Sequence, residues 1–442
     1  MSRIASLSVG PIALAAVGGM LAGGVTLPVR QAQAQMVASV QRSCVTMPDA
    51  LRAGARTSPE IAIAKARQRA AMGRIKKERG TGLPSLSAYA RGADGDSGLV
   101  DGRANTQTGI IASQRIYDFG QGHYRLKSAA ARAREAKFNI LDAQIQSRAA
   151  AGLAFLAVLE AQERLTVSKS REARFLALAE GVDRRLDRGL ITVATASSIR
   201  AEVASATAQR VEQQLTLRNA ETELAIETGL ALLPCSQTEE LPNLLAVPPL
   251  PTDFDVQHAT SLAPAILGAK AARDAAEANV ELARRVQRPT ISIEGVGAYQ
   301  YDNFTKEWEP AKKIGLDVSM PIFSGGSFGG EREEAWANME AATSEIDRLK
   351  RVYRRDLLQG MQRVDAYADL AEARENAASA QRDEVNAVRK QFERGLRPYQ
   401  DYERAEADLA LSEISAIRSR YASLRQRIQV LALLGRLTDV AP

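Results

Sequence analysis

Alternating side chains mark the stretch KIGLDVSMPIF, residues 313–323, as a β-strand with one apolar face. The apolar positions are Ile314, Leu316, Val318, Met320 and Ile322, and polar or small residues separate most of them. A strand of about ten residues that rises about 3.3 Å per residue, tilted by about 45°, covers the hydrocarbon layer of a bilayer. We therefore expect a membrane-inserted strand at this position.

The same landmarks occur twice along the chain. Pro59-Glu60-Ile61 returns as Pro264-Ala265-Ile266, an offset of 205 positions (264 − 59). The offset is 206 (392 − 186) between Leu186-Asp187-Arg188-Gly189-Leu190 and Phe392-Glu393-Arg394-Gly395-Leu396. Solenoid repeats have periods of about 20–50 residues, so this spacing indicates the duplication of a whole half.

The repeat divides the chain into four parts. We predict a signal peptide at residues 1–34, a first repeat at 35–232, a Pro-rich linker at 233–256 and a second repeat at 257–442. The signal peptide prediction rests on basic Arg3, the apolar segment Ile4–Leu27 and the small-residue pattern Ala32-Gln33-Ala34. An uncleaved membrane anchor is the alternative, but six Gly and Pro residues interrupt the segment.

Each half has the same predicted order of elements. A helix comes first, at Pro59 to about Arg79 and at Pro264 to about Gln287, and a strand hairpin follows, at 83–116 and at 289–323. The loops inside the hairpins are expected at 93–106 and 302–311. Next come helical runs without proline, from about Gly122 to Arg188 and from about Ser327 to Arg394, each on the order of 100 Å long. Tips near 189 and 395 carry Arg-Gly-Leu, where Gly can adopt the left-handed helix cap.

The return helices are predicted at Thr195–Glu227 and Pro398–Leu434, and both show coiled-coil spacing. The expected seam of the second is Ile414, Ile417, Tyr421, Leu424, Ile428 and Leu431. The expected seam of the first is Ala204, Ala208, Val211 and Leu215. Helices of this length indicate an elongated, paired structure rather than a compact domain.

Composition argues against several classes of protein. The 58 Lys and Arg residues are interspersed with 52 Asp and Glu residues, which is typical of a solvated helical surface and not of a nucleic-acid interface. Two His and two Cys residues are too few for a multi-histidine metal site or a four-thiolate zinc site. Asp118-Phe119-Gly120 matches a kinase triplet, but no phosphate loop accompanies it. We therefore expect no enzymatic activity, no cofactor and no metal.

A chain with only two membrane hairpins is expected to oligomerise. Unpaired strand edges are too costly in lipid, so the sheet must close, and four strands are too few to close a barrel. Two copies would supply eight strands and a lumen filled by side chains, whereas three would supply twelve strands and a channel. The long helices of the same copies would form a second tube that continues away from the membrane.

The chain resembles the TolC family of outer-membrane channel proteins over essentially its whole mature length. The resemblance is carried, in this order, by Leu83-Pro84-Ser85-Leu86, Arg288-Pro289-Thr290-Ile291, Met320-Pro321-Ile322-Phe323-Ser324-Gly325-Gly326 and the two Arg-Gly-Leu tips. It implies a mixed α/β membrane protein of mainly long α-helices, which form a periplasmic α-helical barrel. Four β-strands per chain would contribute to a trimeric 12-stranded barrel in the outer membrane of a Gram-negative cell.

The resemblance also implies the partners. A homotrimer in contact with outer-membrane lipid would act as a passive exit duct, energised by an inner-membrane ABC or proton-driven transporter through a periplasmic adaptor protein. No nucleic acid is expected. The family docks adaptors at the hairpin tips, which correspond here to Arg188, Gly189, Leu190, Arg394, Gly395 and Leu396.

The periplasmic gate of the family corresponds to Asp401, Arg397, Glu403 and Arg404. Asp401 matches an acidic ring position and Arg397 a linking arginine, while Arg404 occupies a second acidic position, with Glu403 adjacent to it. Phe392 stands where a tyrosine often lies and Thr195 where a partnering aspartate would be, so the closed state is expected to be looser or fastened differently. In the implied fold, the segments that carry Cys44 and Cys235 both approach the equatorial region, and a disulfide between them is plausible in the oxidising periplasm; two free thiols are the alternative.

The sequence leaves the cargo open. We favour type I protein secretion, because the altered tip residues suggest a dedicated partner. The outer-membrane component of a drug or metal efflux pump is the alternative. A periplasmic adaptor-like structural protein is the alternative from another class, but it would carry one helical hairpin rather than two halves with membrane-type strands.

Overall fold

The computed structural model describes residues 44–92, 104–231, 233–235, 260–302 and 306–437. Ser43–Pro442 forms one unit, and the fold described below belongs to it. The predicted signal peptide at 1–34 and all but the first three residues of the predicted linker at 233–256 lie outside the described residues.

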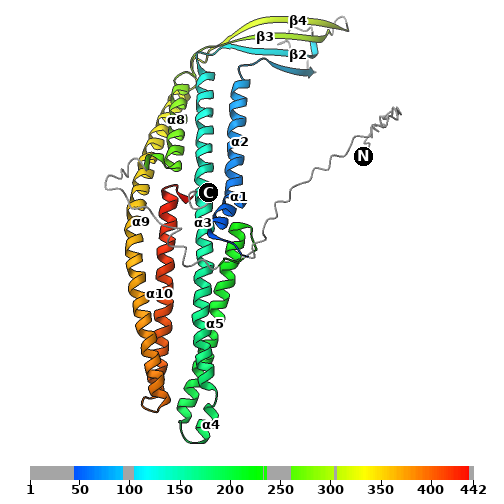
Figure 1. Ribbon diagram of the computed structural model, residues 1–442. Coiled ribbons are helices and arrows are strands. Elements are labelled where there is room, and N and C mark those ends of the chain that lie inside the picture. Colours follow the sequence, from blue (N-terminus) through cyan, green and yellow to red (C-terminus); the bar gives the residue numbers. More distant parts are fainter. Residues whose placement is uncertain (1–43, 93–103, 232, 236–259, 303–305, 438–442) are drawn as a thin grey trace, which may run out of the picture. The chain divides into compact units, whose positions relative to one another are not determined.

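Four antiparallel strands form one sheet in the order β1-β2-β3-β4 (Figure 1). The strands are β1 (Ser85–Gly92), β2 (Ala104–Tyr117), β3 (Thr290–Asp302) and β4 (Glu307–Ser319). Each half of the chain contributes one hairpin, and β2 pairs with β3 across the halves. At this junction a Cβ atom on Gly109 would lie only 2.6 Å from the Gly297 carbonyl oxygen, so the close pairing requires glycine.

The strand boundaries differ from the prediction at three places. β4 ends at Ser319, so Met320–Phe323 is not part of the strand; Pro321 has no N–H with which to continue a ladder. β4 begins at Glu307, inside the predicted 302–311 loop, and includes Pro310. An edge strand tolerates this proline because one side of its backbone needs no partner. β2 likewise begins at Ala104, inside the predicted 93–106 loop.

Five helices of the first half lie in the described residues: α1 (Met47–Thr57), α2 (Pro59–Gly80), α3 (Gln121–Ala179), α4 (Val182–Asp187) and α5 (Val193–Thr228). The sequence analysis missed α1, although Thr46 caps it by accepting a hydrogen bond from the Asp49 N–H. The prediction of one unbroken helix from Gly122 to Arg188 was wrong. Gly181 adopts φ +90° and separates α3 from α4. Its counterpart 206 positions later is Ala387, which continues the helix of the second half.

The second half contains α8 (Pro264–Ala283), α9 (Ser327–Glu393) and α10 (Tyr399–Leu433). α8 ends four residues before the predicted Gln287, whereas α9 and α10 match their predicted ranges to within one residue. In Figure 1, α9 and α10 run side by side, as do α3 and α5. α8 and α10 both pack between α3 and α9, and α2 packs against the other side of α3.

The main core lies where α10, α1 and α5 meet the middle of α3. It contains Phe155, Leu156, Val158 and Leu159 of α3, Tyr421, Leu424, Ile428 and Leu431 of α10, Met47 and Leu51 of α1, and Leu224 of α5. The predicted α10 seam is thus confirmed, since its residues from Ile417 to Leu431 are buried. Fully burying a large aliphatic or aromatic side chain contributes about 1.5–3 kcal/mol each, so this cluster dominates the packing.

The predicted α5 seam was wrong within the single chain. Val211 and Leu215 are more than half exposed, and Ala204 and Ala208 are exposed too. α5 packs against its own chain through Ala196, Ile199, Ala206 and Leu224 instead. The spacing identified an apolar stripe correctly, but that stripe faces away from α3.

None of the described helices is both long and apolar enough to cross a membrane.

Candidate functional site: the helical tips and the apolar sheet face

One face of the sheet is apolar across all four strands. Ile314, Leu316 and Val318 of β4 lie opposite Gly295, Ile293 and Ile291 of β3. The register then continues to Ala112 and Ile110 of β2 and to Leu86 and Ala88 of β1. Gln114, opposite Ile293, is the one polar residue of this patch among these pairs. Alternate residues point to opposite faces of a sheet, so these side chains form one continuous apolar surface.

This surface lacks cover from the described part of the chain. Ile314 is 83% exposed, Leu86 73% and Leu316 65%. β1 and β4 are the edges of the sheet within the described residues, and each edge carries unpaired backbone groups. An exposed apolar face with two open edges fits a sheet that completes itself with further copies in a lipid environment.

The two helical hairpins end in matching turns. Gly189 has φ +69° and Gly395 has φ +74°, which confirms the left-handed caps. The N–H of Gly395 donates to the Phe392 carbonyl and that of Leu396 to the Gln391 carbonyl, both at 2.9 Å. Gly189 and Leu190 make the same pair of bonds, at 2.9 Å each, to Leu186 and Arg185. Both tips are therefore Schellman turns.

The tip leucines point into solvent. Leu190 is 68% exposed and Leu396 is 71% exposed, and Arg188 and Arg394 are exposed beside them. Each tip thus presents an exposed apolar side chain next to a cation. Such a surface is suited to protein contact rather than to chemistry on a small molecule.

The four predicted gate residues lie in or beside the first turn of α10 but do not form one group. Arg397 and Asp401 form a half-exposed ion pair at 3.7 Å. Arg404 is exposed one turn further along, where it lies roughly on the same side as Asp401. Glu403 is half-buried and turned toward Glu202 of α5 and Arg171 of α3. Burial and then Glu202 raise the pKa of the Glu403 carboxyl, and Arg171 opposes them.

An aromatic cluster fills the space behind the second tip. Phe392 stacks on Tyr402 with ring centroids 5.9 Å apart and meets the edge of Tyr399 at 6.0 Å. Phe175 of α3 lies 6.4 Å from Tyr402. Phe392 therefore packs against its own hairpin and offers no hydroxyl to a neighbour. Thr195 contacts Thr192, whose hydroxyl accepts from the Thr195 N–H and caps α5.

The sequence analysis missed a buried carboxylate beside this cluster. Glu406 is fully buried; it accepts hydrogen bonds from Arg174 of α3 at 2.9 Å and from the Tyr402 hydroxyl at 2.8 Å. The sequence feature that could have revealed it is a charged residue inside the apolar stripe of Tyr402, Ala405 and Leu409. A charge in such a position is buried and therefore requires a partner. Arg174 supplies that partner and joins the first helical hairpin to the second.

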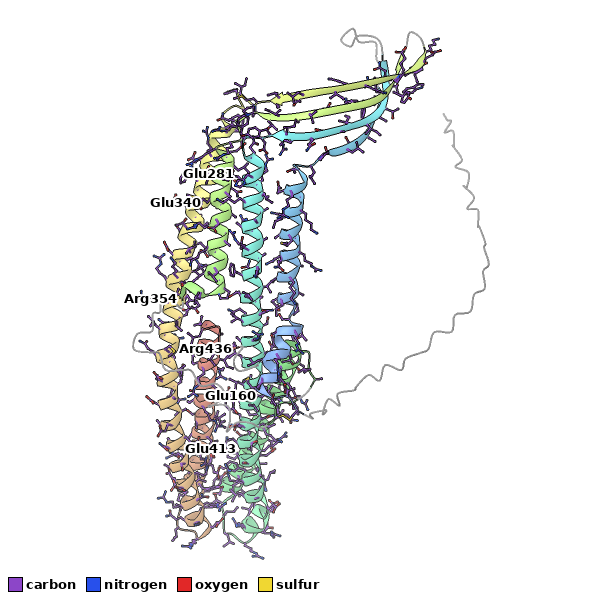
Figure 2. All side chains as sticks on the ribbon, turned by 45° about the horizontal axis from the view of Figure 1, so that its top comes forward. Glu160, Glu281, Glu340, Arg354, Glu413 and Arg436 are labelled. Carbon is purple, nitrogen blue, oxygen red and sulfur yellow. A yellow bond between two sulfur atoms is a disulfide. The ribbon has the colours of Figure 1, made fainter. Side chains whose placement is uncertain are left out.

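More ion pairs join α3 to α10 above this point. Arg420 and the Tyr421 hydroxyl both contact Glu163, and Arg425 pairs with Glu160. Figure 2 labels Glu160 on α3. The contacts place several charge-assisted hydrogen bonds across the same helix pair, which fixes how the two hairpins lie against each other.

The structure contains a disulfide between Cys44 and Cys235, whose Cα atoms are 5.0 Å apart. Two backbone hydrogen bonds of 2.8 Å flank it, from Val45 N–H to the Leu233 carbonyl and from Cys235 N–H to the Val45 carbonyl. The segment before α1 is thus attached to the residues that follow α5.

Within the described residues, no group of three or more His, Cys, Asp or Glu side chains is placed to hold a metal ion.

A family model for outer membrane efflux proteins matches residues 50–229 and 256–436. Outer membrane protein TolC of Escherichia coli (strain K12) is 20% identical over 405 residues, covering 87% of this chain and 80% of TolC. Outer membrane efflux protein BepC of Brucella suis is 24% identical over 396 residues, covering 88% of this chain and 82% of BepC. The crystal structure of the Campylobacter jejuni CmeC outer membrane channel is similar in fold, with a TM-score of 0.74 and 14% identity over 88% of this chain and 85% of CmeC.

These matches cover both halves of the chain and agree with its four-stranded sheet and paired long helices. Proteins of this kind are channels of the outer membrane that extend into the periplasm, and they are transport conduits rather than enzymes. The chain belongs to the outer membrane efflux protein family, to which the TolC-type channels belong.

Proposed function

We propose that three copies of this chain form a passive exit duct that carries cargo across the periplasm and the outer membrane. The apolar sheet face with its two open edges carries this proposal. Exposed side chains such as Ile314 and Leu316 gain a lipid environment when the chain inserts. The edge strands β1 and β4 gain partners when neighbouring copies join the sheet.

The duct depends on two partners for energy and access. A periplasmic adaptor docks on the hairpin tips at Arg188, Gly189, Leu190, Arg394, Gly395 and Leu396, and it connects the duct to an inner-membrane transporter. The matching Schellman turns and exposed leucines of the two tips support this role, because they present similar surfaces around the ring.

The gate proposal concerns the start of α10. Asp401, with Arg397 and Arg404 near it, would line the periplasmic opening of the duct, and three Asp401 carboxylates would favour cations there. Glu403 contributes less to such a ring, since it is half-buried against α5 and α3.

For the cargo, we place efflux of small molecules first. The matching family model and the BepC relative are both described as efflux proteins. Type I protein secretion is the second candidate, and the departures at Phe392 and Thr195 favour it because they suggest a dedicated partner. Deletion of the gene separates the two: intracellular accumulation of a fluorescent dye indicates efflux, whereas loss of proteins from the culture medium indicates secretion.

The docking role is tested by Gly395→Trp, with Gly395→Ala as the control. Both variants place a side chain at φ +74°, and no other group lies within 4 Å of it, so they share the backbone strain and differ in bulk. We expect Gly395→Trp to abolish export while trimers still form, and Gly395→Ala to retain most export. Normal export by Gly395→Trp would remove this tip from the docking site.

A further inference from the structure

The helices of one chain have two lateral edges with opposite unpaired charges. α9 packs against α8 and α10, which separate it from α3, while α2 and α5 pack on α3 from the other side. Figure 1 shows α9 at one end of this row and α2 and α5 at the other. In a ring of identical chains, the α9 edge of one copy meets the α2–α5 edge of the next.

The α9 edge carries two arginines without an acidic partner. Three nearby basic groups already have one: Arg348 pairs with Glu345 at 2.6 Å, Lys350 with Asp347 at 3.5 Å and Arg355 with Asp356 at 2.7 Å. Arg351 and Arg354 are exposed and have no ion pair within the described residues.

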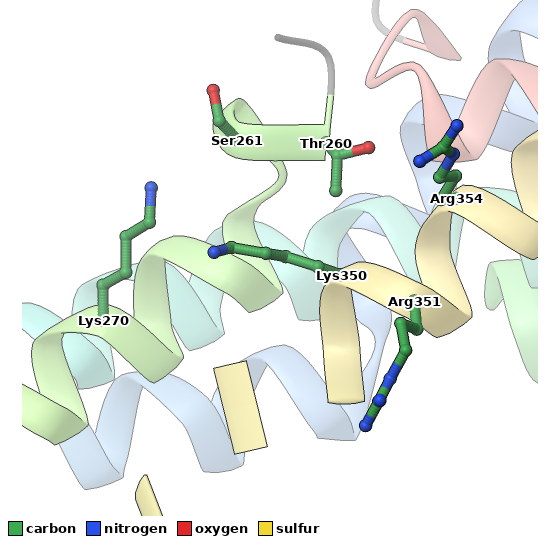
Figure 3. A pocket seen from close by; sticks show the side chains of 6 residues that line it. All are labelled: Thr260, Ser261, Lys270, Lys350, Arg351 and Arg354. Carbon is green, nitrogen blue, oxygen red and sulfur yellow. The ribbon is translucent and has the colours of Figure 1, made fainter. Parts of the chain in front are cut away.

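These arginines line a cavity of about 360 Å³ with Thr260, Ser261, Lys270 and Lys350 (Figure 3). None of the described residues that line this cavity is acidic. Lys350 already pairs with Asp347, but Lys270, Arg351 and Arg354 leave an excess of positive charge, so this part of the α9 edge favours an anionic partner.

The α2–α5 edge carries the complementary charge. Glu60 at the start of α2 and Glu223 and Glu227 near the end of α5 have no cationic partner among the described residues. The Glu60 carboxylate accepts a hydrogen bond from the Ser58 hydroxyl, at 2.6 Å. Burial, then Glu223 and Glu60, raise the pKa of the Glu227 carboxyl. Glu227 therefore lies near the negative charges of Glu223 and Glu60, and a cation placed beside it would be stabilised.

The two charged groups lie at the same level along α3. Asp142 of α3 lines one cavity together with Glu60 and a second cavity together with Val352, Tyr353 and Asp356 of α9. One residue of α3 is thus level with the acidic group on one side and with the Arg351–Arg354 stretch on the other. A rotation of the chain about an axis parallel to α3 keeps this level, so it brings the two groups to the same height.

Apolar side chains accompany the charges. Ile226, between Glu223 and Glu227, is 68% exposed, and Leu215 lies on the same side of α5. Leu358, one turn after Arg354, is partly exposed on α9. Removing such side chains from water favours association, and the charges then select the register.

We propose that Glu60, Glu223 and Glu227 of one protomer pair with Arg351 and Arg354 of the next, and that this contact sets the register of neighbouring chains in the trimer. The inference rests on the proposed trimer and adds the residues that join its members. Since each chain supplies both edges, the contact is head-to-tail and occurs three times in a closed ring.

Charge exchange tests the contact in detergent-purified protein, with the trimer fraction followed by native mass spectrometry against temperature. We expect the pair Glu223→Lys and Glu227→Lys to lower the trimer-to-monomer equilibrium constant by more than roughly tenfold, because like charges then face each other. The pair Arg351→Glu and Arg354→Glu should do the same. The combination of all four changes should restore most of the wild-type trimer. The matched control exchanges the charges of Arg348 and Glu345, which form an ion pair within one chain. This exchange should have little effect on the trimer fraction.

Cysteine pairs give a direct readout, because both native cysteines are already bonded to each other. Glu227→Cys with Arg354→Cys should yield covalent dimers and trimers on oxidation, and neither single variant should. Normal trimers from the charge-reversed pairs, together with no crosslink from the cysteine pair, would overturn this contact. A loss of trimers that the combined charge exchange does not restore would overturn it as well. Both results would leave the proposed duct intact. Absence of trimers from the wild-type protein would contradict the duct itself.

Discussion

At the scale of single residues, two buried tyrosines of α10 differ in their hydrogen bonds. Tyr402 donates to Glu406 at 2.8 Å, and burial, then Glu406, raise the pKa of its hydroxyl, which therefore remains a donor. Tyr399 is equally buried, but its hydroxyl has no hydrogen-bond partner among the described residues. A buried polar group without a partner destabilises the fold, whereas one with a partner contributes modestly.

Replacing each tyrosine by phenylalanine should therefore have different effects on stability. Tyr402→Phe should lower the free energy of unfolding by about 1–2 kcal/mol, because it removes a hydrogen bond from a buried carboxylate. Tyr399→Phe, its matched control on the same helix, should be neutral or stabilising. Thermal unfolding followed by circular dichroism measures both, and equal destabilisation by the two variants would show that the Glu406 contact is unimportant.

At the scale of elements, the sequence predicted those features that depend on local patterns. The long helix α9, the return helix α10 and both left-handed glycine turns follow from helical periodicity and the Arg-Gly-Leu motif. The break at Gly181 was missed because an isolated glycine is often tolerated inside a helix. The predicted α5 seam is exposed in the single chain, because spacing shows that a face is apolar but not what covers it.

The first turn of α10 offers a test of the gate. Asp401 is half-exposed and paired only loosely with Arg397, so three copies would place accessible carboxylates at the constriction of the duct. Asp401→Ala should reduce the cation preference of single channels in planar bilayers and weaken block by divalent cations. Asp408→Ala, an exposed aspartate about two turns further along the same helix, is the control. Unchanged selectivity and block in Asp401→Ala would exclude the ring.

At the scale of the whole molecule, contacts between distant segments were the hardest to predict. The Arg174–Glu406 pair joins residues that are 232 positions apart, and no local pattern names the partner of a buried charge. The apolar sheet face was predictable, since alternation along each strand fixes which side chains share a face. The four strands lie in the sheet in their order along the chain. Their register, which the structure supplies, joins the apolar faces of the single strands into one surface.

The Cys44–Cys235 disulfide acts at this scale as well, because it closes a loop across the first half, with a separation of 191 residues. In the chain-entropy view, a loop of that size contributes on the order of 5 kcal/mol to stability. Cys44→Ser should lower the melting temperature, and a reducing agent should lower that of the wild-type protein but not of the variant. Two thiols that react with a labelling reagent without reductant would show that the bond is absent.

The mass of the purified chain tests the account most directly. Size-exclusion chromatography with multi-angle light scattering, with and without detergent, gives that mass. We expect a trimer that stays in solution only with detergent, because its apolar sheet face and open strand edges require lipid-like surroundings and neighbouring copies. A monomer that remains soluble in plain buffer would contradict the account.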